Sequence, residues 1–386
     1  MTHREDERDL AALVVPRVGK LRETGDPWEP YHLLDAGGTT VGAVAAFLKE
    51  LQASGRPAAT QYSYANDLLR WFRFCWVIGV PWNQATRTEA RDFSRWIQIS
   101  TKSPQPGRQA ARDLGAVKPT RAARRPGTVN PVTGKPSPGQ TYAPTTAAHS
   151  ETVLRSFYEF HLEAGTGPII NPFPLTRKRR AHAHHNPMQP FCNERSGLYR
   201  PRVPRRIPRR IPDDLFNELF TNLGHNRDRA LVAFWISTGA RASELLGLLR
   251  SGVDPGQQLI TVVRKGSREL QRLPASPDAF IWFRLYENQM QGQVPAGPND
   301  PVWLTLRRPY RPLSYHAARQ MFTRANESLG ANWSLHDLRH SAAYRMKVSG
   351  VASGASFGGS RERRGPGIRG QRVAGGDGVR AGRHAV

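Results

Sequence analysis

One stretch near the C-terminal end constrains the fold of this chain most. Residues 333–346 read Trp-Ser-Leu-His-Asp-Leu-Arg-His-Ser-Ala-Ala-Tyr-Arg-Met, and their apolar members recur at the spacing of an amphipathic helix. Ser334 stands where the N-cap of that helix would be. His336, Arg339 and His340 crowd the start of the same helix. Because a helix N-terminus attracts negative charge, the pattern predicts an anion at that end.

The balance of charge indicates the class of partner. The chain has 386 residues, with 56 Lys and Arg against 31 Asp and Glu, and a formal net charge of +25. So basic a chain favours a polyanion, with nucleic acid as the leading candidate, over an acidic small substrate. An anionic membrane would need a basic amphipathic helix or a long apolar span, and the sequence shows neither. The start of the chain mixes acids with bases and lacks the apolar core of a secretory signal, so we expect a cytoplasmic protein.

Breaks in the helical pattern divide the chain, and its length suggests two domains. Residues 1–39 mix charges with prolines and glycines, and we expect a loosely ordered extension. Residues 40–170 contain four stretches of helical spacing, which predict a small helical bundle. A stretch rich in Pro, Gly and Arg at 101–148 interrupts them, and we interpret it as an inserted basic loop.

Residues 171–212 are the predicted linker between the two domains. From position 177 to position 210 they contain eleven Lys or Arg and a single acid, Glu194. Such an extended basic segment suits a phosphate backbone, although a merely solvated linker is the alternative. The predicted DNA-binding residues are Arg177, Lys178, Arg179, Arg180, Arg205, Arg206, Arg209 and Arg210.

Residues 213–350 predict a second, mostly helical domain with a small sheet. A β-branched run at 259–263, a turn and a returning strand at 269–273 predict an antiparallel hairpin. Helices are expected at about 213–223, 226–237, just past Gly239, 277–289, 314–329 and 335–348. From about residue 351 the chain turns to Gly, Arg, Ala and Ser, with seven arginines and two acids. Such a tail cannot bury a helix face, so we expect disorder at 351–386.

Two further residues could handle an anion. Gly239 permits a tight turn, and Arg241 then enters the first turn of a helix that leucines anchor in the core. A guanidinium grips two oxygens of one phosphate because it is planar and always charged, but Arg241 alone would be an ordinary surface arginine. Lys265 lies at the tip of the predicted hairpin and could donate a proton if its pKa were lowered. A solvated turn lysine is the commoner case.

The order of these pieces resembles the tyrosine recombinase (phage integrase) family. The pieces are Thr-Gly-Ala-Arg-Ala-Ser-Glu-Leu-Leu-Gly-Leu, then Lys-Gly on a β-turn, then His-Asp-Leu-Arg-His on a helix. The resemblance covers about residues 40–350, including a closing Arg-Ser-Phe-Tyr helix at 155–158. It implies a mainly α fold: a helical, SAM-like core-binding domain and a mixed, mostly helical catalytic domain with a small antiparallel sheet. It also implies site-specific DNA recombination or integration for a mobile element, by a homo-oligomer that forms a tetrameric synapse on DNA.

The resemblance also implies roles for individual residues. Arg241 and Arg339 would hold the non-bridging oxygens of the scissile phosphate and stabilise the charge of the transition state. Lys265 would protonate the leaving 5′ oxygen. His336 would occupy the family's position for proton transfer and phosphate contact. The family needs no metal or other cofactor, since the arginines supply the positive charge.

Two supporting residues and one departure complete the resemblance. Glu244 matches an acidic position that supports the first arginine, and His340 would orient its helix. The family places its nucleophile, a tyrosine, on a later helix behind a Leu-Gly-His segment, and neither is present. The only tyrosine after His340 is Tyr344, which comes too early, so we assign no nucleophile. The resulting hypothesis is a truncated or frameshifted recombinase with an incomplete catalytic domain; the alternative is a catalytically inactive DNA-binding protein or pseudogene product.

A metal site is a further interpretation of residues 333–346. His336 and His340 stand four apart on a helix, like the metal pair of the zincins, but Asp337 stands where those enzymes have Glu. No third ligand suggests itself. The two cysteines, Cys75 and Cys192, lie in different segments and cannot build a disulfide framework or a four-cysteine zinc site. We therefore predict no metal.

Overall fold

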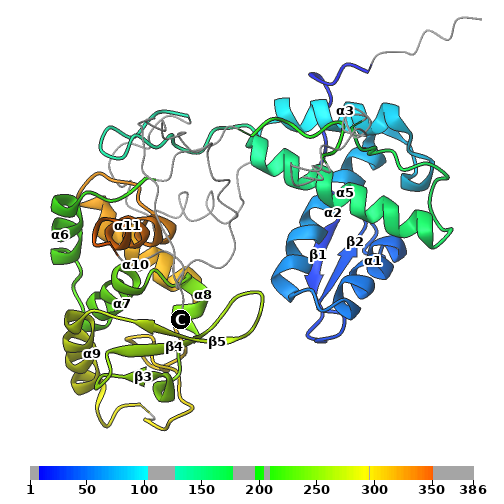
Figure 1. Ribbon diagram of the computed structural model, residues 1–386. Coiled ribbons are helices and arrows are strands. Elements are labelled where there is room, and N and C mark those ends of the chain that lie inside the picture. The colour runs from blue at the N-terminus through cyan, green and yellow to red at the C-terminus, as the bar shows by residue number, and fades with distance from the viewer. Residues whose placement is uncertain (1–7, 103–126, 177–195, 204–208, 295, 351–386) are drawn as a thin grey trace, which may run out of the picture. The chain divides into compact units, whose positions relative to one another are not determined.

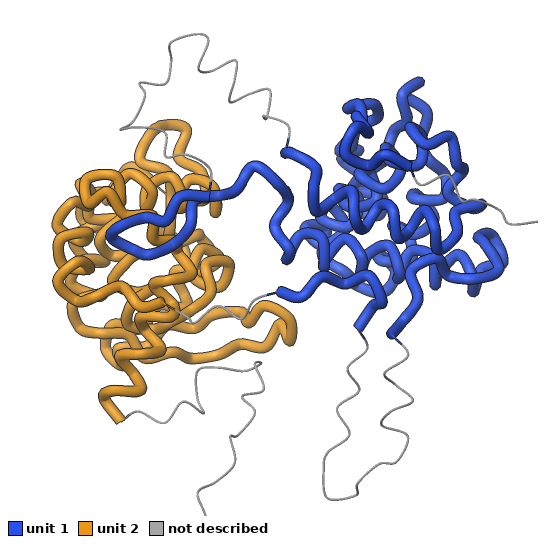
Figure 2. Tube along the Cα trace, turned by 90° about the horizontal axis from the view of Figure 1, so that it is seen from above, with its two compact units in different colours: residues 1–207 blue, residues 208–386 orange. Residues whose placement is uncertain are grey.

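The computed structural model describes residues 8–102, 127–176, 196–203, 209–294 and 296–350. The chain forms two compact units, residues 1–207 and 208–386, and each has its own hydrophobic core (Figure 2). Half of the predicted 101–148 insertion (residues 103–126), the 351–386 tail and Cys192 lie outside the described residues. So do six of the predicted DNA-binding residues, namely Arg177, Lys178, Arg179, Arg180, Arg205 and Arg206.

The described part of the first unit is a helical bundle with an N-terminal hairpin (Figure 1). Its helices are α1 (Gly42–Ala53), α2 (Ala58–Ile78), a 3-10 turn (Trp82–Gln84), α3 (Arg87–Ile99) and α5 (Pro144–Glu163). Gly79 ends α2 in the left-handed conformation (φ 66°), and Pro144 opens α5 because a first-turn residue needs no donor. The helices expected between residues 40 and 170 are present.

The core of this bundle is aromatic. Trp71 and Tyr158 are fully buried, and the Trp71 Nε1 donates to the Tyr158 hydroxyl at 3.0 Å. That hydroxyl in turn donates to the Trp82 carbonyl at 2.7 Å. Phe93 meets the Trp71 ring edge to face, with centroids 5.2 Å apart. α2, α5 and the 3-10 turn are thus joined by both packing and hydrogen bonds.

The N-terminal segment corrects one prediction: its described part is not loosely ordered. Two antiparallel strands, β1 (Lys20–Glu23) and β2 (Tyr31–Leu34), form a hairpin there. Leu33 is completely buried in the bundle core. Arg73 on α2 donates its Nε to the Val18 carbonyl at 2.7 Å and its Nη2 to the Gly19 carbonyl at 2.8 Å. The hairpin is therefore part of the first unit.

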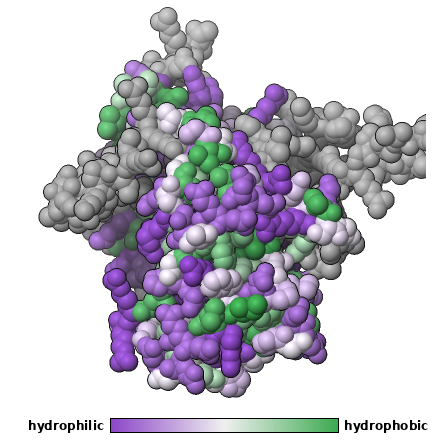
Figure 3. Space-filling view, turned by 90° about the vertical axis from the view of Figure 1, so that its left-hand side faces the viewer, coloured by the Kyte–Doolittle hydropathy of each residue, from purple (hydrophilic) through white to green (hydrophobic). Residues whose placement is uncertain are grey.

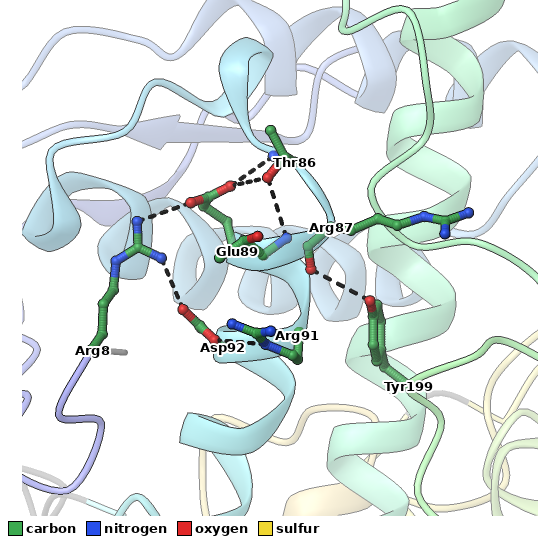
Figure 4. Close-up of polar contacts among 8 residues, drawn as sticks. Arg8, Thr86, Arg87, Glu89, Arg91, Asp92 and Tyr199 are labelled. Atoms are coloured by element: carbon green, nitrogen blue, oxygen red, sulfur yellow. Dashed lines mark hydrogen bonds and ion pairs between the residues drawn. The ribbon is translucent and has the colours of Figure 1, made fainter. Parts of the chain in front are cut away.

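Arg8 anchors the start of the described chain to α3 (Figure 4). Its Nη2 donates to Glu89 at 2.9 Å and its Nη1 to Asp92 at 2.8 Å, and both carboxylates are buried. Glu89 also accepts from the backbone N–H and the hydroxyl of Thr86, which closes the N-terminal capping box of α3. The charge of Arg8 therefore does not stay in solvent, because two buried acids of the bundle pair with it.

The described part of the second unit is mostly helical with one small antiparallel sheet. Its elements are α6 (Asp213–Thr221), α7 (Asn226–Thr238), α8 (Ala242–Leu246), a 3-10 turn (Arg250–Gly252), β3 (Val253–Asp254), β4 (Leu259–Val263), β5 (Leu270–Pro274), α9 (Pro277–Met290), α10 (Tyr315–Glu327) and α11 (Leu335–Val348). The strand order is β3-β4-β5, and Val263 pairs with Leu270 beside the hairpin turn. The predicted fold class and hairpin are confirmed, and the short β3 is an addition.

Helix α7 is the centre of the second unit. It packs against both α9 and α11 (Figure 1), and every residue from Ala230 to Ile236 is buried. Near its start the buried Arg227 donates its Nε to Asp228 at 2.8 Å and its Nη1 to the Leu304 carbonyl at 2.9 Å. These bonds satisfy both charges inside the core. α7 is therefore a rigid support for whatever lies at its C-terminal end.

The face of the molecule drawn in Figure 3 is mainly polar. On the face shown in Figure 3, hydrophilic residues predominate and apolar ones form small patches. Among the described residues, no helix combines the length and apolar character needed to cross a bilayer.

Candidate phosphate-binding site

The turn between α7 and α8 fixes the first candidate arginine. Gly239 ends α7 in the left-handed conformation, with φ 62° and ψ 19°, which a glycine adopts without steric cost. The Thr238 hydroxyl donates to the Phe234 carbonyl at 2.6 Å and accepts from the Ala240 N–H at 3.2 Å. Arg241 follows as the N-cap of α8, one residue earlier than the first-turn position expected from the sequence. It is therefore mounted on a locked turn.

Glu244 joins this turn to the tip of the β4–β5 hairpin. Its carboxylate accepts from the Arg241 backbone N–H at 2.9 Å and from the Arg241 Nη1 at 2.8 Å. It also accepts from the Lys265 backbone N–H at 3.0 Å, and the Arg264 Nη1 lies 3.6 Å from its Oε2. Glu244 itself is only 3% exposed. One buried carboxylate thus organises two candidate catalytic positions that lie on different elements.

The environment of Glu244 keeps it charged. Burial opposes ionisation of the carboxyl, but the N–H groups of Arg241 and Lys265 and the charges of Arg241 and Arg264 outweigh burial. Together they hold the pKa of Glu244 below its ordinary value. At neutral pH the carboxylate is ionised and holds its donors in place.

The second candidate arginine approaches the same turn from α11. Ser334 caps α11 as predicted: its N–H and its hydroxyl both donate to Asp337 at 2.7 Å. Arg339, one turn further on, donates its Nη1 to the Gly239 carbonyl at 2.6 Å. Burial, and then repulsion from Arg241, lower the pKa of Arg339, which still stays far above neutrality because guanidinium groups are very weak acids. Arg241 and Arg339 therefore meet at one turn.

Of the remaining predicted residues, Lys265 and His336 are exposed and His340 is half-buried. Lys265 is exposed on a turn that the Arg264 N–H closes by donating to the Glu269 carbonyl at 2.9 Å. His336 is exposed on the first turn of α11, and its ring meets that of His340 edge to face, with centroids 4.4 Å apart. In the part of the chain that the structure describes, no group of three or more His, Cys, Asp or Glu could hold a metal ion.

Arg264 is the site residue that the sequence reasoning missed. Its side chain is 11% exposed and faces Glu244. A signal was present, because the alternation of strand β4, with Ile260 and Val262 buried and Val263 exposed, turns the next residue inward. At this turn the sequence analysis singled out only Lys265.

Comparison with known families decides the identity of this unit. Residues 210–353 match the model of the phage integrase family. This region is a phage integrase domain. Tyrosine recombinase XerD of Chlorobaculum tepidum is 31% identical over 128 residues, which cover 32% of this chain and 41% of that protein. XerD of Pseudomonas aeruginosa is likewise 31% identical over 128 residues, covering 32% of this chain and 42% of that protein. The chain thus spans about two fifths of the curated relatives it matches.

Two solved structures of integrases are also similar over most of the chain. One is the Tn1549 transposon integrase in complex with circular intermediate DNA, at 12% identity and a TM-score of 0.49, covering 81% of this chain and 88% of that one. The other is a lambda integrase dimer bound to a COC′ core site, at 13% identity and a TM-score of 0.48, covering 80% of this chain and 70% of that one.

The end of the basic linker docks on helix α11 of the integrase domain. The Ile211 N–H donates to the Ser341 hydroxyl at 2.8 Å, and both groups are buried. Arg209 and Arg210 just before it are exposed, as a DNA contact requires. Arg210 lies over the Tyr344 ring at 4.3 Å, and Tyr344 is 43% exposed. Tyr344 therefore lies on the surface of the domain beside the linker.

Proposed function

We propose that this chain binds double-stranded DNA and that its integrase domain clamps one backbone phosphate for site-specific recombination. The observation that carries the proposal is the meeting of Arg241 and Arg339 at the Gly239 turn, beside the buried Glu244. Two guanidinium groups beside one carboxylate leave an excess of positive charge on rigid elements. Such a site suits a phosphodiester and the additional charge of its transition state.

The surrounding residues take the remaining steps. Arg241 and Arg339 contact the non-bridging oxygens, and Lys265, on a turn tied to Glu244, protonates the leaving 5′ oxygen. His336, exposed at the start of α11, assists proton transfer at the phosphate. His340 orients His336 through their ring contact.

The rest of the chain supplies the grip on DNA. We assign DNA binding to residues 40–170 and to the basic linker 171–212, and the phosphate clamp to residues 213–350. The net charge of +25 supports salt-dependent binding to the DNA backbone. Because recombination joins two duplexes, the active form is a homo-oligomer on DNA, acting in the cytoplasm on a mobile element.

A second candidate function is DNA binding without cleavage. The position of Tyr344 favours it, because the ring of this tyrosine stacks on Arg210. It shares a rigid helix with Arg339, five residues on, and so points away from the direction of that arginine. On this proposal the chain holds the phosphate but forms no phosphotyrosyl bond.

A binding experiment tests the clamp, and a cleavage experiment separates the two functions. The binding experiment follows the fluorescence anisotropy of a labelled random-sequence duplex from about 50 to 200 mM salt. The affinity should fall steeply as salt rises, because each phosphate contact releases counterions from the DNA. Nicked suicide duplexes then report a covalent adduct. Binding without an adduct supports the second function. An adduct that Tyr344→Phe abolishes supports recombination by this chain and excludes the second.

A further inference from the structure

The guanidinium groups of Arg264 and Arg241 contact different oxygens of the same carboxylate. The Arg241 Nη1 is 2.8 Å from Glu244 Oε1, and the Arg264 Nη1 is 3.6 Å from Glu244 Oε2. The two arginines come from separate elements, the N-cap of α8 and the turn after β4. Their exposure also differs, since the Arg241 side chain is 32% exposed and that of Arg264 is 11% exposed.

This geometry creates a conflict for Arg241. Its Nη1 is already bound to Glu244, and the same guanidinium has to turn toward a phosphate if it is to grip two oxygens. Glu244 is 3% exposed, so water cannot replace the guanidinium that leaves. A buried carboxylate without a countercharge is strongly unfavourable, and it would hold Arg241 back.

Arg264 is placed to resolve the conflict. Both polar groups of its backbone are hydrogen-bonded. The Arg264 N–H donates to the Glu269 carbonyl at 2.9 Å, and the Arg264 carbonyl accepts from the Arg268 N–H at 3.1 Å. Its largely buried side chain has little access to DNA and faces Glu244. Besides the two guanidinium groups, the backbone N–H groups of Arg241 and Lys265 and the more distant charge of Arg339 act on this carboxylate.

We propose that Arg264 is a positioning residue that keeps the Glu244 carboxylate neutralised while Arg241 turns to a DNA phosphate. The proposal rests on the phosphate clamp described above and adds a third guanidinium to it. Without Arg264, Arg241 remains on Glu244 and the phosphate loses one of its two guanidinium partners. With Arg264, three guanidinium charges act on one carboxylate, and the surplus charge is available to the phosphate.

A double-mutant cycle with Glu244 tests this role. The full chain and its variants are titrated with a random-sequence duplex at constant salt. Arg264→Gln should weaken binding roughly tenfold, the usual size of one lost charge-assisted contact. Arg268→Gln is the matched control, because it removes an exposed arginine from the same turn. Arg264→Lys should bind like the parent, since it keeps the charge.

The decisive readout is suppression by Glu244→Gln. When the carboxylate carries no charge, Arg264 has nothing to neutralise, so Arg264→Gln should weaken binding no more than Arg268→Gln does in that background. An equal loss in both backgrounds would overturn the proposal, because an arginine that merely stabilises the turn, or contacts DNA directly, gives that result. The proposal would also be overturned if, in the parent background, Arg264→Gln weakened binding no more than Arg268→Gln does.

The same titrations separate this inference from the proposed function. Arg241→Gln should weaken binding beyond Arg268→Gln if the clamp exists. If it does so while Arg264→Gln matches the control, only the role of Arg264 is wrong. If Arg241→Gln also matches the control, the clamp itself is wrong. Thermal unfolding of each variant shows whether it is folded, and Arg264→Met, which also removes the charge, serves as the test variant if Arg264→Gln is not.

Discussion

Replacing Glu244 by alanine should destabilise the integrase domain more than replacing any exposed acid. The substitution removes the acceptor of the Arg241 and Lys265 backbone N–H groups, of the Arg241 guanidinium and of the nearby Arg264 charge. Breaking a buried ion pair from one side costs about 3–5 kcal/mol. Arg241 is partly exposed and recovers some hydration, so we expect about 3 kcal/mol.

Urea denaturation measures this loss. Because the chain has two compact units, the transition of the integrase domain must be followed separately, for example by hydrogen exchange of α7 amides. Glu287→Ala is the matched control: Glu287 accepts from Arg250 at 2.8 Å but is 27% exposed, and its loss should cost about 1 kcal/mol or less. A Glu244→Ala domain as stable as the Glu287→Ala domain would refute the view that Glu244 organises the site.

Three further outcomes follow from particular residues. Gly239→Ala should cost about 1–2 kcal/mol in urea denaturation because its φ of 62° is left-handed, whereas Gly239→Asn, which tolerates that region, should cost less. Tyr158→Phe should cost the first unit about 1–2 kcal/mol, since the buried Trp71 Nε1 loses its acceptor; an unchanged midpoint would contradict this. The lowered pKa of Glu244 means that its stabilisation is present above the unfolded-state pKa of about 4.3 and is lost as pH falls through the folded value. In a Glu244→Gln variant, domain stability should therefore fall less steeply below about pH 4 than in the parent. Equal pH dependence of stability in the two proteins would contradict this role of Glu244.

The second unit could be predicted well because its signals are local. The helices, the hairpin at β4 and β5, and the Ser334 cap follow from periodicity and turn chemistry within a few residues. Arg241, Lys265 and Arg339 were found as candidates in the same way. Their convergence was not visible in their spacing, since the bond from Arg339 to Gly239 joins residues a hundred positions apart.

The features that could not be predicted from the sequence depend on contacts between residues that are far apart in the chain. The N-terminal segment has the composition of a loose extension, yet its Arg8 finds Glu89 and Asp92 on α3, and Leu33 finds the bundle core. Arg264 was overlooked although the alternation of β4 signals an inward side chain. A charged residue beside a turn normally stays in solvent, and only the buried Glu244 gives it another place.

The affinity of Arg241→Gln and Arg339→Gln variants for duplex DNA, measured against salt, tests the phosphate clamp most directly. Each arginine that neutralises a phosphate contributes about one unit to the slope of log affinity against log salt. We predict that each substitution lowers the slope by about one and weakens binding more than the exposed control Arg268→Gln. Slopes and affinities equal to those of the control would contradict a phosphate clamp at the Gly239 turn.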